Sequence, residues 1–427
     1  MKNIIGIILA ANLLLLSGCS ESGTTRDDGE KRIKLWVAPS ESQEAFWKVA
    51  VEQWNSSGLG TPVDFTTIPA TESSEKAVLT ALVAGNAPDI STNIFSGFAA
   101  QLASLGQLQD LVAMDGYEEL IAARHMGSIM EGWDQDGKKY VFPIYSNPTL
   151  IWWRGDILQK LGITDIPETF DDVYALSEKY AASDHKYGMQ VIAGRDWADR
   201  WFDFISLYYA TAGGAPYIKD GKAVYDNAAS LAVLIFMETI FKNDWTALDF
   251  DSDEPLVSGL VAGAVRGPWD VAYFQRMYPD TLEKIVIGPM IAAQKTAGKT
   301  PTFADSKGLV IFRHSKLKKE AFAFISWVFQ NDALSLLWLE KTSLPPARGD
   351  LTENAIFKSF YETHPLARIY AAYVDVAAPS AFIESTIDVQ KTMGFEMVEP
   401  MKFGDKSPKT ALADAVRRTN KLLRRSQ

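Results

Sequence analysis

The sequence predicts an α/β fold, and three observations lead to this prediction. Strand and helix patterns alternate from residue 33 to residue 90, and a similar alternation resumes after residue 140. The composition, with 47% hydrophobic and 22% charged residues in 427, is that of a globular protein with a large core. At about 150 residues per domain, this length predicts two or three domains. Such a composition excludes a disordered chain, a collagen-like chain and a small disulfide scaffold.

The first alternation begins with a strand at 33–37, where apolar residues alternate with Lys34 and Trp36. Ser40 to Ser42 offer a helix cap, and apolar residues at helical spacing follow as far as Trp54. A second strand is predicted around 63–68, a helix over 73–84, and a third strand from Asp89. Strand, helix, strand, helix, strand is typical of a parallel, doubly wound sheet.

The pattern repeats in the middle of the chain. Residues 140–153 are rich in aromatic and β-branched side chains, which favours extended structure. Near the C-terminus, Ser407 is placed to cap a helix that Pro408 begins, with arginines in its last turn. The remaining predicted elements are helices near 168–182, 197–212, 228–242 and 317–331, and strands at 283–290 and 307–313.

The N-terminus predicts export. Lys2 precedes an apolar run from Ile4 to Leu16 that is too short to span a bilayer comfortably, so residues 1–18 are interpreted as a signal peptide. The Leu-Ser-Gly-Cys sequence ending at Cys19 resembles the lipobox of bacterial lipoproteins, which predicts acylation of this only cysteine. The alternative is a plain signal peptide followed by a free thiol. Residues 19–30 are small and polar, as in a flexible tether.

The chain lacks the signatures of several protein classes. Its net charge of −11 argues against a nucleic-acid-binding protein. The sequence contains no catalytic or nucleotide-binding motif of the common types, and its four histidines are widely spaced, so no enzyme, cofactor or metal site is predicted. Asp251, Asp253 and Glu254 form an acidic group beside Pro255, which is more typical of a solvated loop than of a glycosidase carboxylate pair.

Several segments resemble the extracellular solute-binding proteins of ABC transporters, specifically the sugar-binding group that includes the maltose-binding proteins. Gly85 to Ile90 is similar to the family's Gly-Asn-Ala-Pro-Asp segment, and this is the most specific match. Further landmarks follow in the family's order. They are Gly137 to Pro143, Leu150 to Arg154, Pro167 to Asp172, Gly213-Gly214, Gly221-Lys222, Asp226, Gly267-Pro268-Trp269 and Leu344 to Arg348. Trp152 to Arg154 replaces the usual Tyr-Tyr-Asn, and Ala304 to Ser306 stands where a glycine pair is common.

The resemblance implies a two-lobed periplasmic-binding-protein fold of type II, with a hinge of crossing strands and a ligand cleft between the lobes. The implied first lobe is 31–144 plus 287–331, and the second is 145–286 plus 332–427. The implied function is that of a monomeric, lipid-anchored substrate-binding lipoprotein. It captures a mono- or oligosaccharide outside the cytoplasm and delivers it to a membrane permease.

A sugar site needs aromatic faces to cover the rings and polar groups to pair the hydroxyls. Carried over from the family, Trp269 is the expected stacking platform, because the Gly-Pro turn before it directs the side chain; the alternative is a core tryptophan. The other expected ligand contacts are Ser40, Glu41, Asn93, Asn147, Asp196, Trp197, Asp270 and Phe382, with Asp305 and Arg348 near the cleft edges.

Two other functions stay open. The same fold can take another solute, such as a polyol, a glycerophosphodiester or a peptide. A lipid-anchored glycoside hydrolase would need two carboxylates flanking the sugar, and the sequence places only isolated ones.

Overall fold

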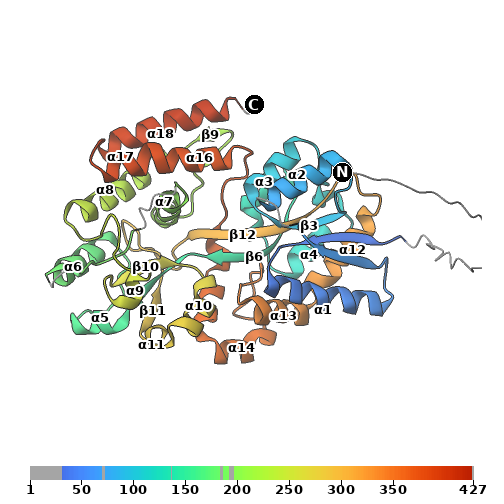
Figure 1. Cartoon of the computed structure of the whole chain (residues 1–427), viewed down its shortest axis with the longest axis horizontal. Coiled ribbons are helices and arrows are strands. Elements are labelled where there is room, and N and C mark those ends of the chain that lie inside the picture. Colours follow the sequence, from blue (N-terminus) through green and yellow to red (C-terminus); the bar gives the residue numbers. More distant parts are fainter. Residues whose placement is uncertain (1–30, 70–72, 136, 183–185, 192–196, 426–427) are drawn as a thin grey trace, which may run out of the picture. The chain divides into compact units, whose positions relative to one another are not determined.

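The computed structural model describes residues 31–69, 73–135, 137–182, 186–191 and 197–425. The predicted signal peptide, Cys19 and the predicted tether lie outside the described residues, as does Asp196. Arg32–Gln427 forms a unit of its own, and all helices and strands below belong to it (Figure 1).

The first sheet confirms the predicted alternation of strands and helices. Strands β1 (Ile33–Val37), β2 (Val63–Thr67) and β3 (Ile90–Ile94) are parallel, with β1 in the middle. Helices α1 (Glu41–Ser57) and α2 (Ser74–Ala84) connect them. The alternate residues of β1 are buried and form part of the core. Beyond β3 the sheet continues with β12 (Thr302–Ile311), which is antiparallel to β3, and then the short β13 (Ala377–Ala378).

The ends of the two connecting helices follow from local chemistry. Ser73 caps α2 by accepting a hydrogen bond from the Lys76 backbone, and Gly85 ends it with a left-handed backbone (φ 71°), which glycine adopts without strain. Ser40 occupies the cap position of α1, but its hydroxyl lies 3.2 Å from that of Ser42 and caps no backbone N–H.

The second sheet differs from the prediction of a second parallel repeat. Strand β7 (Leu150–Arg154) lies between β10 (Gly263–Arg266) and β11 (Ile285–Gly288), and both neighbours run antiparallel to it. The predicted extended segment 140–153 is divided, because β6 (Phe142–Pro148) pairs with β12 while β7 belongs to this other sheet. Thr149 marks the division. Alternation of residue types indicates strands but does not give their partners.

Three hydrophobic clusters pack against the sheets, and the smallest of them includes Trp152 and Phe274. The first cluster includes Leu35, Phe142, Leu309, Phe329 and Trp338. The second cluster includes Trp153, Phe204, Phe236, Phe303 and Met397. Strand β12 contributes to both, since Phe303 lies in the second cluster and Leu309 in the first. Strands β6 and β12 thus run side by side from one half of the unit to the other (Figure 1).

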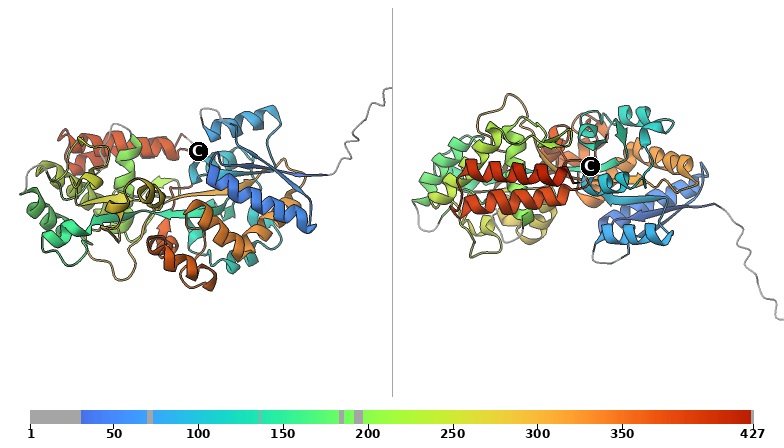
Figure 2. Two further views of the ribbon diagram at one scale, coloured as in Figure 1. Left: turned by 60° about the horizontal axis from the view of Figure 1, so that its bottom comes forward. Right: turned by 90° about the horizontal axis from the view of Figure 1, so that it is seen from above.

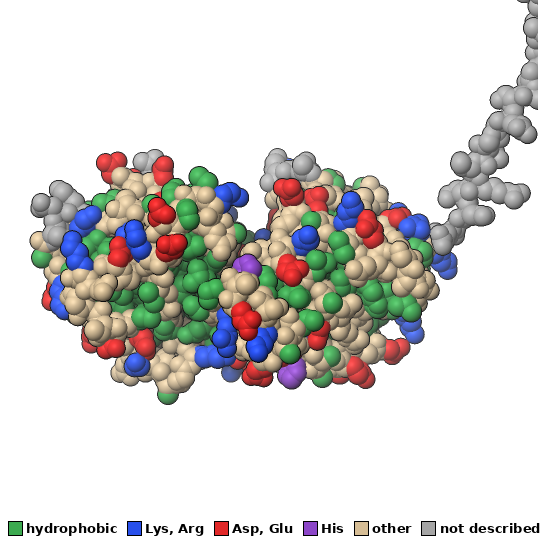
Figure 3. Space-filling view, turned by 90° about the horizontal axis from the view of Figure 1, so that it is seen from below, with side chains coloured by type: hydrophobic (Ala, Val, Ile, Leu, Met, Phe, Trp, Pro, Cys, Tyr) green, Lys and Arg blue, Asp and Glu red, His purple; other side chains and the backbone are tan. Residues whose placement is uncertain are grey.

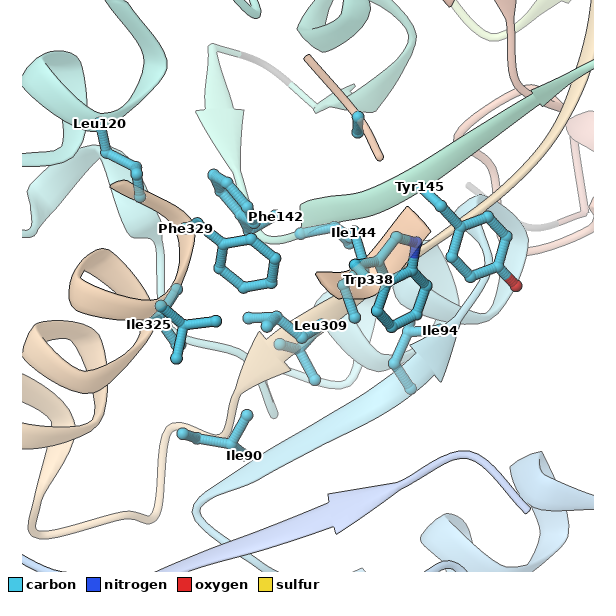
Figure 4. Close-up of a cluster of buried hydrophobic side chains, with 14 of the residues drawn as sticks. Ile90, Ile94, Leu120, Phe142, Ile144, Tyr145, Leu309, Ile325, Phe329 and Trp338 are labelled. Atoms are coloured by element: carbon cyan, nitrogen blue, oxygen red, sulfur yellow. The ribbon is translucent and has the colours of Figure 1, made fainter. Parts of the chain in front are cut away.

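Helix α13 (Asp332–Thr342) packs in the first cluster. Its Trp338 ring lies 5.1 Å from Phe46 and 5.8 Å from Tyr145, and Figure 4 shows it beside Ile144 and Leu309. The resemblance placed residues from 332 onward in the second lobe. We propose instead that the first lobe also includes α13, because the helix packs in the first cluster. An amphipathic helix pattern alone does not tell which core the helix joins.

The other elements complete the two halves. Ser407 caps α18 (Pro408–Leu423) as predicted, Arg424 and Arg425 lie just beyond its end, and the helix lies beside α16 and α17 (Figure 2).

Among the described residues no single helix is long and apolar enough to cross a membrane; α12 and α13 meet that criterion only as a pair bent by 77°. The remaining helices are α3 (Ser96–Ser104), α4 (Tyr117–Ala123), α5 (Gly155–Lys160), α6 (Phe170–Ala181), α7 (Trp197–Thr211), α8 (Ala228–Lys242), α9 (Pro255–Ser258), α10 (Trp269–Met277), α11 (Pro279–Leu282), α12 (Lys318–Gln330), α14 (Lys358–Thr363), α15 (Pro365–Ala371), α16 (Thr386–Thr392) and α17 (Glu399–Lys402). The short strands are β4 (Asp134–Gln135), β5 (Lys138–Lys139), β8 (Ile218–Lys219) and β9 (Lys222–Ala223), and the short helical turns are Leu111–Ala113, Ile129–Trp133, Ala355–Phe357, Val374–Val376 and Met393–Val398.

Candidate functional site

Four polar side chains share one face of the strands that join the two halves. In the β6–β12 ladder Asn147 lies opposite Asp305, and Tyr145 lies opposite Lys307. Alternate residues of a strand face the same side, and side chains opposite each other in a ladder are neighbours. Tyr145, Asn147, Asp305 and Lys307 therefore form a connected group, here called the central strip. Figure 3 shows a notch in the outline of the molecule between its two halves, and Figure 1 shows β6 and β12 running from one half to the other.

The central strip contains acceptors that the described residues leave without donors. Asn147 is 3% exposed, and its Oδ1 has no hydrogen-bond partner within the described part of the chain. The carboxylate of the half-buried Asp305 makes no hydrogen bond or ion pair with any described residue. Burial raises the pKa of Asp305, and the charge of Lys307 offsets part of this effect. Because unpartnered buried acceptors cost stability, such a strip is typical of a site that a ligand completes.

Tyr145 connects the central strip to the start of α1. Burial raises the pKa of its phenol, and the negative charge of Asp305 raises it further, whereas a hydrogen bond with Gln43 lowers it. Gln43 lies in the first turn of α1, close in sequence to the predicted contacts Ser40 and Glu41. The side chain of Glu41 is exposed.

Asn93 lies within β3 with a left-handed backbone (φ 62°), a conformation that asparagine tolerates better than most residues. Its Nδ2 donates a hydrogen bond to Ser74 Oγ at 3.0 Å, which fixes the amide at the start of α2. The amide is half-buried, so the predicted polar contact lies at a strand end in a defined orientation.

An aromatic group adjoins the central strip on the side of the second half. Phe303, two residues before Asp305, lies edge-on to Trp201 at 5.2 Å and to Phe202 at 5.5 Å. Phe202 lies edge-on to Trp269 at 6.3 Å. These four rings, here called the aromatic group, connect Trp269 to the strand that carries Asp305.

Trp269 is partly exposed, which favours a platform over a core residue. Its exposed fraction is 37%, whereas Trp152 and Trp153 are fully buried. The indole folds back over Gly267, where an added Cβ would lie 2.2 Å from the ring. The Gly-Pro turn therefore does position Trp269, because only glycine leaves room for the ring there.

Two predicted contacts are engaged elsewhere in the fold. Arg348 is 1% exposed and binds Asp350 at 2.5 Å and Asp332 at 2.6 Å, so its charge is already paired within the first half. Asp270 lies in a cluster with Arg266, 3.7 Å away, and burial raises its pKa. We retain neither as a ligand contact. The sequence shows that these residues are charged, but it does not show which residues they pair with in the folded protein.

The two remaining predicted contacts lie at element ends. Trp197 is the first residue of α7. Phe382 lies between β13 and α16, is half-buried and packs against the first cluster. The sequence interpretation missed Tyr145, Gln43, Phe202 and Phe303. The alternation of Phe303, Asp305 and Lys307 along one strand was a usable signal, because it places an aromatic, an acid and a base on one face.

A separate hollow of about 440 Å³ lies next to the Gly-Pro turn. It shares Pro268 with the turn before Trp269 and includes no residue of the central strip. In the described part of the chain no three His, Cys, Asp or Glu side chains lie close enough together to hold a metal ion. The hollow is lined by Pro268, Val271, Gln275, Pro279, Leu282, Glu283, Ile285, Ser343, Phe360, Thr363, His364, Pro365, Leu366 and Ala367.

Comparison with known proteins identifies the family and the fold. The family described as bacterial extracellular solute-binding protein matches residues 38–334. An uncharacterized protein of Listeria monocytogenes EGD-e is 30% identical, with a TM-score of 0.87, over 92% of this chain and 99% of that chain. The cyclic alpha-maltosyl-1,6-maltose binding protein of Arthrobacter globiformis is 17% identical (TM-score 0.78), covering 93% and 100% of the two chains. The sugar-binding protein MalE of Xanthomonas citri is 16% identical (TM-score 0.75), covering 92% and 98%.

These similarities confirm the predicted α/β, two-lobed periplasmic-binding-protein fold of type II. The match to the family extends over more than half of the chain, from the end of β1 into α13. This protein therefore belongs to the bacterial extracellular solute-binding proteins.

Proposed function

We propose that this chain is the substrate-binding lipoprotein of an ABC importer that captures a carbohydrate outside the cytoplasm and delivers it to a membrane permease. The observation that carries the proposal is the central strip, with its unpartnered acceptors beside the partly exposed Trp269. A sugar presents hydroxyl donors around its ring and weakly polar C–H groups on its faces. Asp305 and Asn147 offer acceptors to the hydroxyls, and Trp269 offers a flat surface to a ring face.

A thermal-shift screen followed by calorimetry tests this function. The mature chain is mixed with neutral mono-, di- and trisaccharides, polyols, a glycerophosphodiester and short peptides. A bound ligand raises the apparent stability by about 2.7 kcal/mol at one hundred times its Kd. We expect shifts with one or more sugars and none with the other classes. A shift with only a polyol, glycerophosphodiester or peptide would overturn the carbohydrate assignment.

The glycoside hydrolase alternative makes a different prediction. Hydrolysis needs two carboxylates about 5 to 10 Å apart across the bond that is cut. In the central strip an amide, Asn147, lies opposite the carboxylate of Asp305. We therefore expect oligosaccharides to remain intact on long incubation with the protein, and released products seen by chromatography would contradict a pure binding function.

We further propose that the two lobes close on the ligand about β6 and β12. The family match and the position of these strands between the two clusters support this motion. Small-angle scattering is expected to give a smaller radius of gyration with saturating ligand than without it. An unchanged radius, with binding confirmed by calorimetry, would argue against closure.

The proposed anchor at Cys19 rests on the sequence alone. Metabolic labelling with a fatty acid is expected to mark the wild type and not Cys19→Ser, and to leave the mature chain without residues 1–18. Equal labelling of both proteins would exclude acylation at this position. The family is extracellular, which agrees with export.

A further inference from the structure

The first sheet has a second end, away from the central strip. Strands β1, β2 and β3 begin at this end, and the antiparallel β12 finishes there. The backbone N–H of Phe312, just after β12, donates to the carbonyl of Asp89, just before β3, at 3.0 Å. The backbone N–H of Arg313 donates to the carbonyl of Gln107, which follows α3, at 2.7 Å. The surface where these segments meet is here called the basal face, and it consists of the start of β1, the start of α12 and the loops 58–62, 85–89, 105–107 and 312–316.

Cations from several elements gather on the basal face. Lys34 in β1 and Arg313 and Lys316 after β12 are exposed, and none of the three forms an ion pair with a described residue. Lys319, in the first turn of α12, is 85% exposed and has only the exposed Asp115 near it, at 3.8 Å. These ammonium and guanidinium groups are therefore available to a partner outside the fold.

The acids of the basal face are mostly engaged within the fold. Asp64 binds Arg32 at 2.8 Å. Asp89 is half-buried and accepts hydrogen bonds from the Ser315 hydroxyl at 2.5 Å and from a backbone N–H of β1 at 2.8 Å. Glu320, in the first turn of α12, is half-buried. The basal face thus keeps an excess of positive charge in a chain whose net charge is −11.

Exposed apolar side chains lie among these cations. Leu59 follows α1, Val83 lies in the last turn of α2 and Leu105 follows α3, and their exposed fractions are 66%, 92% and 57%. Single exposed apolar residues need no explanation, but here they share one face with cations. Such a face fits a bilayer surface, because apolar groups enter the headgroup region while cations meet anionic lipids.

The chain that leads to the predicted anchor joins the fold at this same face. Arg32 directly precedes β1, so the segment from Cys19 to Lys31 is attached there. Its 13 residues span at most about 45 Å, and a flexible chain of that length averages roughly 20 Å. Four acids and one arginine give this segment a negative charge, so the positive charge near the anchor comes from the basal face.

We propose that the basal face rests on an anionic phospholipid surface, with its cations against the headgroup phosphates and its exposed apolar side chains among the headgroups. The candidate ligand site lies toward the other ends of the same strands, so this orientation leaves it open to solvent. The inference goes beyond the proposed function and does not depend on the ligand. It uses the proposed anchor only to bring the face to a membrane.

The size of the effect follows from the charge of the surface. Each Lys or Arg near an anionic bilayer changes the binding constant about fivefold. Charges farther away than about 10 Å are largely screened at 0.1 M salt, so the net negative charge of the chain opposes binding only weakly. Removing three cations of the basal face is therefore expected to weaken binding about 100-fold.

The first experiment is vesicle sedimentation of the mature chain carrying Cys19→Ser, in which no acyl chain can contribute. Vesicles of phosphatidylglycerol and phosphatidylcholine in equal parts are compared with vesicles of phosphatidylcholine alone, at about 0.1 M and about 1 M salt. We expect binding to the anionic vesicles at the lower salt, and binding at least tenfold weaker in each of the other conditions. Equal binding to both kinds of vesicle, or binding to neither, overturns the inference. Binding to soluble heparin as tight as to the anionic vesicles assigns the face to polyanions and also overturns it.

The second experiment compares two triple variants that remove the same charge. The test variant carries Lys34→Gln, Arg313→Gln and Lys316→Gln, and the control carries Lys219→Gln, Lys222→Gln and Lys421→Gln, which are exposed cations of the second half. We expect the test variant to bind anionic vesicles about 100-fold more weakly and the control to stay within about threefold of the parent chain. Equal losses in the two variants would show that net charge and not the basal face determines binding, and would overturn the inference. Apo-protein melting checks that both variants are folded.

Discussion

Arg348 and Asp305 are both charged side chains, but the fold supplies partners for Arg348 and none for Asp305 among the described residues. Arg348 is 1% exposed and has carboxylate partners at 2.5 Å and 2.6 Å, while Asn354 donates to both of those aspartates. Asp305 forms no pair within the described residues, and the amide opposite it has an unpartnered oxygen. The paired network around Arg348 therefore stabilises the fold. The central strip, with its unpartnered acceptors, lies where the two halves meet.

The difference shows in the pKa values of the acids. Burial acts to raise the pKa of Asp350, but hydrogen bonds from Arg348 and Asn354 hold it below its ordinary value. At Asp305 burial also acts to raise the pKa, and the charge of Lys307 offsets it only in part. A buried charge thus indicates function only when its partners are missing, because a paired charge is already satisfied by the fold.

The largest expected effect is on stability, from Arg348→Ala. Removing the guanidinium leaves Asp350 and Asp332 without their cation, and breaking a buried pair costs about 3–5 kcal/mol of unfolding free energy. Chemical denaturation measures this loss. Arg32→Ala is the control, because the pair of Arg32 with Asp64 is exposed and such pairs contribute about 1 kcal/mol or less.

Ligand affinity of the folded Arg348→Ala protein is expected to stay near the wild-type value. A variant with normal stability and weak binding would instead return Arg348 to the site, as the sequence had suggested, and would remove the contrast with Asp305.

The next effect is on affinity, from Trp269→Ala. If the indole covers a sugar ring, its loss costs roughly 2 kcal/mol, or about a 30-fold weaker Kd. Apo stability is expected to change little, because the side chain is 37% exposed. The buried Trp47, at 0% exposure, is the control, and its replacement by alanine is expected to cost about 3–5 kcal/mol of stability. Normal affinity, or a stability loss as large as that of Trp47→Ala, would show that Trp269 is a core residue.

The sequence indicated those features of the candidate site that depend on local structure. The Gly-Pro turn correctly indicated a directed Trp269, and Asn147 and Asp305 lie opposite each other in the central strip. It did not predict Phe202 and Phe303 as supports for Trp269, because they come from α7 and β12, which only the tertiary fold brings together.

The fold shows the same limit. Alternation of residue types gave β1, β2 and β3 with their two helices, where each strand pairs with a near neighbour in sequence. It did not give the antiparallel pairing of β7 with β10 and β11, whose partners lie more than one hundred residues away. Periodicity fixes the face that a residue occupies, while pairing over long separations depends on the whole fold.

A smaller effect on affinity is expected from Gly267→Ala. Its Cβ would lie 2.2 Å from the indole of Trp269, and the mobile end of that side chain must move away. We expect a Kd roughly tenfold weaker, or about 1.4 kcal/mol, with apo stability within about 1 kcal/mol of the wild type. Gly127→Ala is the control, because nothing lies within 4 Å of its added Cβ. In the Trp269→Ala background Gly267→Ala should add nothing, and an additive loss would exclude action through the indole.

The smallest expected effect is a difference between the two regions in how their contribution to the unfolding free energy depends on pH. Folding raises the pKa of Asp305 above its ordinary value of 3.8, so the folded state holds this proton more tightly and stability falls as pH rises above about 3.8. Folding lowers the pKa of Asp350 and Asp332, so their contribution is present above 3.8 and is lost as pH falls below it. The slope between the two pKa values of each group is at most about 1.4 kcal/mol per pH unit.

The difference in unfolding free energy between Asp305→Asn and the wild type isolates the first of these slopes, since all other groups cancel. Because folding raises the pKa of Asp305 above 3.8, we expect the difference to favour the variant more at pH 7 than at pH 4. Burial holds the pKa of Tyr145, which faces Asp305, above its ordinary value, so this phenol stays neutral over this range. A difference that is constant with pH, or that favours the wild type at pH 7, would mean that Asp305 has a partner in solution. The contrast between the paired network around Arg348 and the central strip would then be wrong, because it depends on Asp305 having no partner.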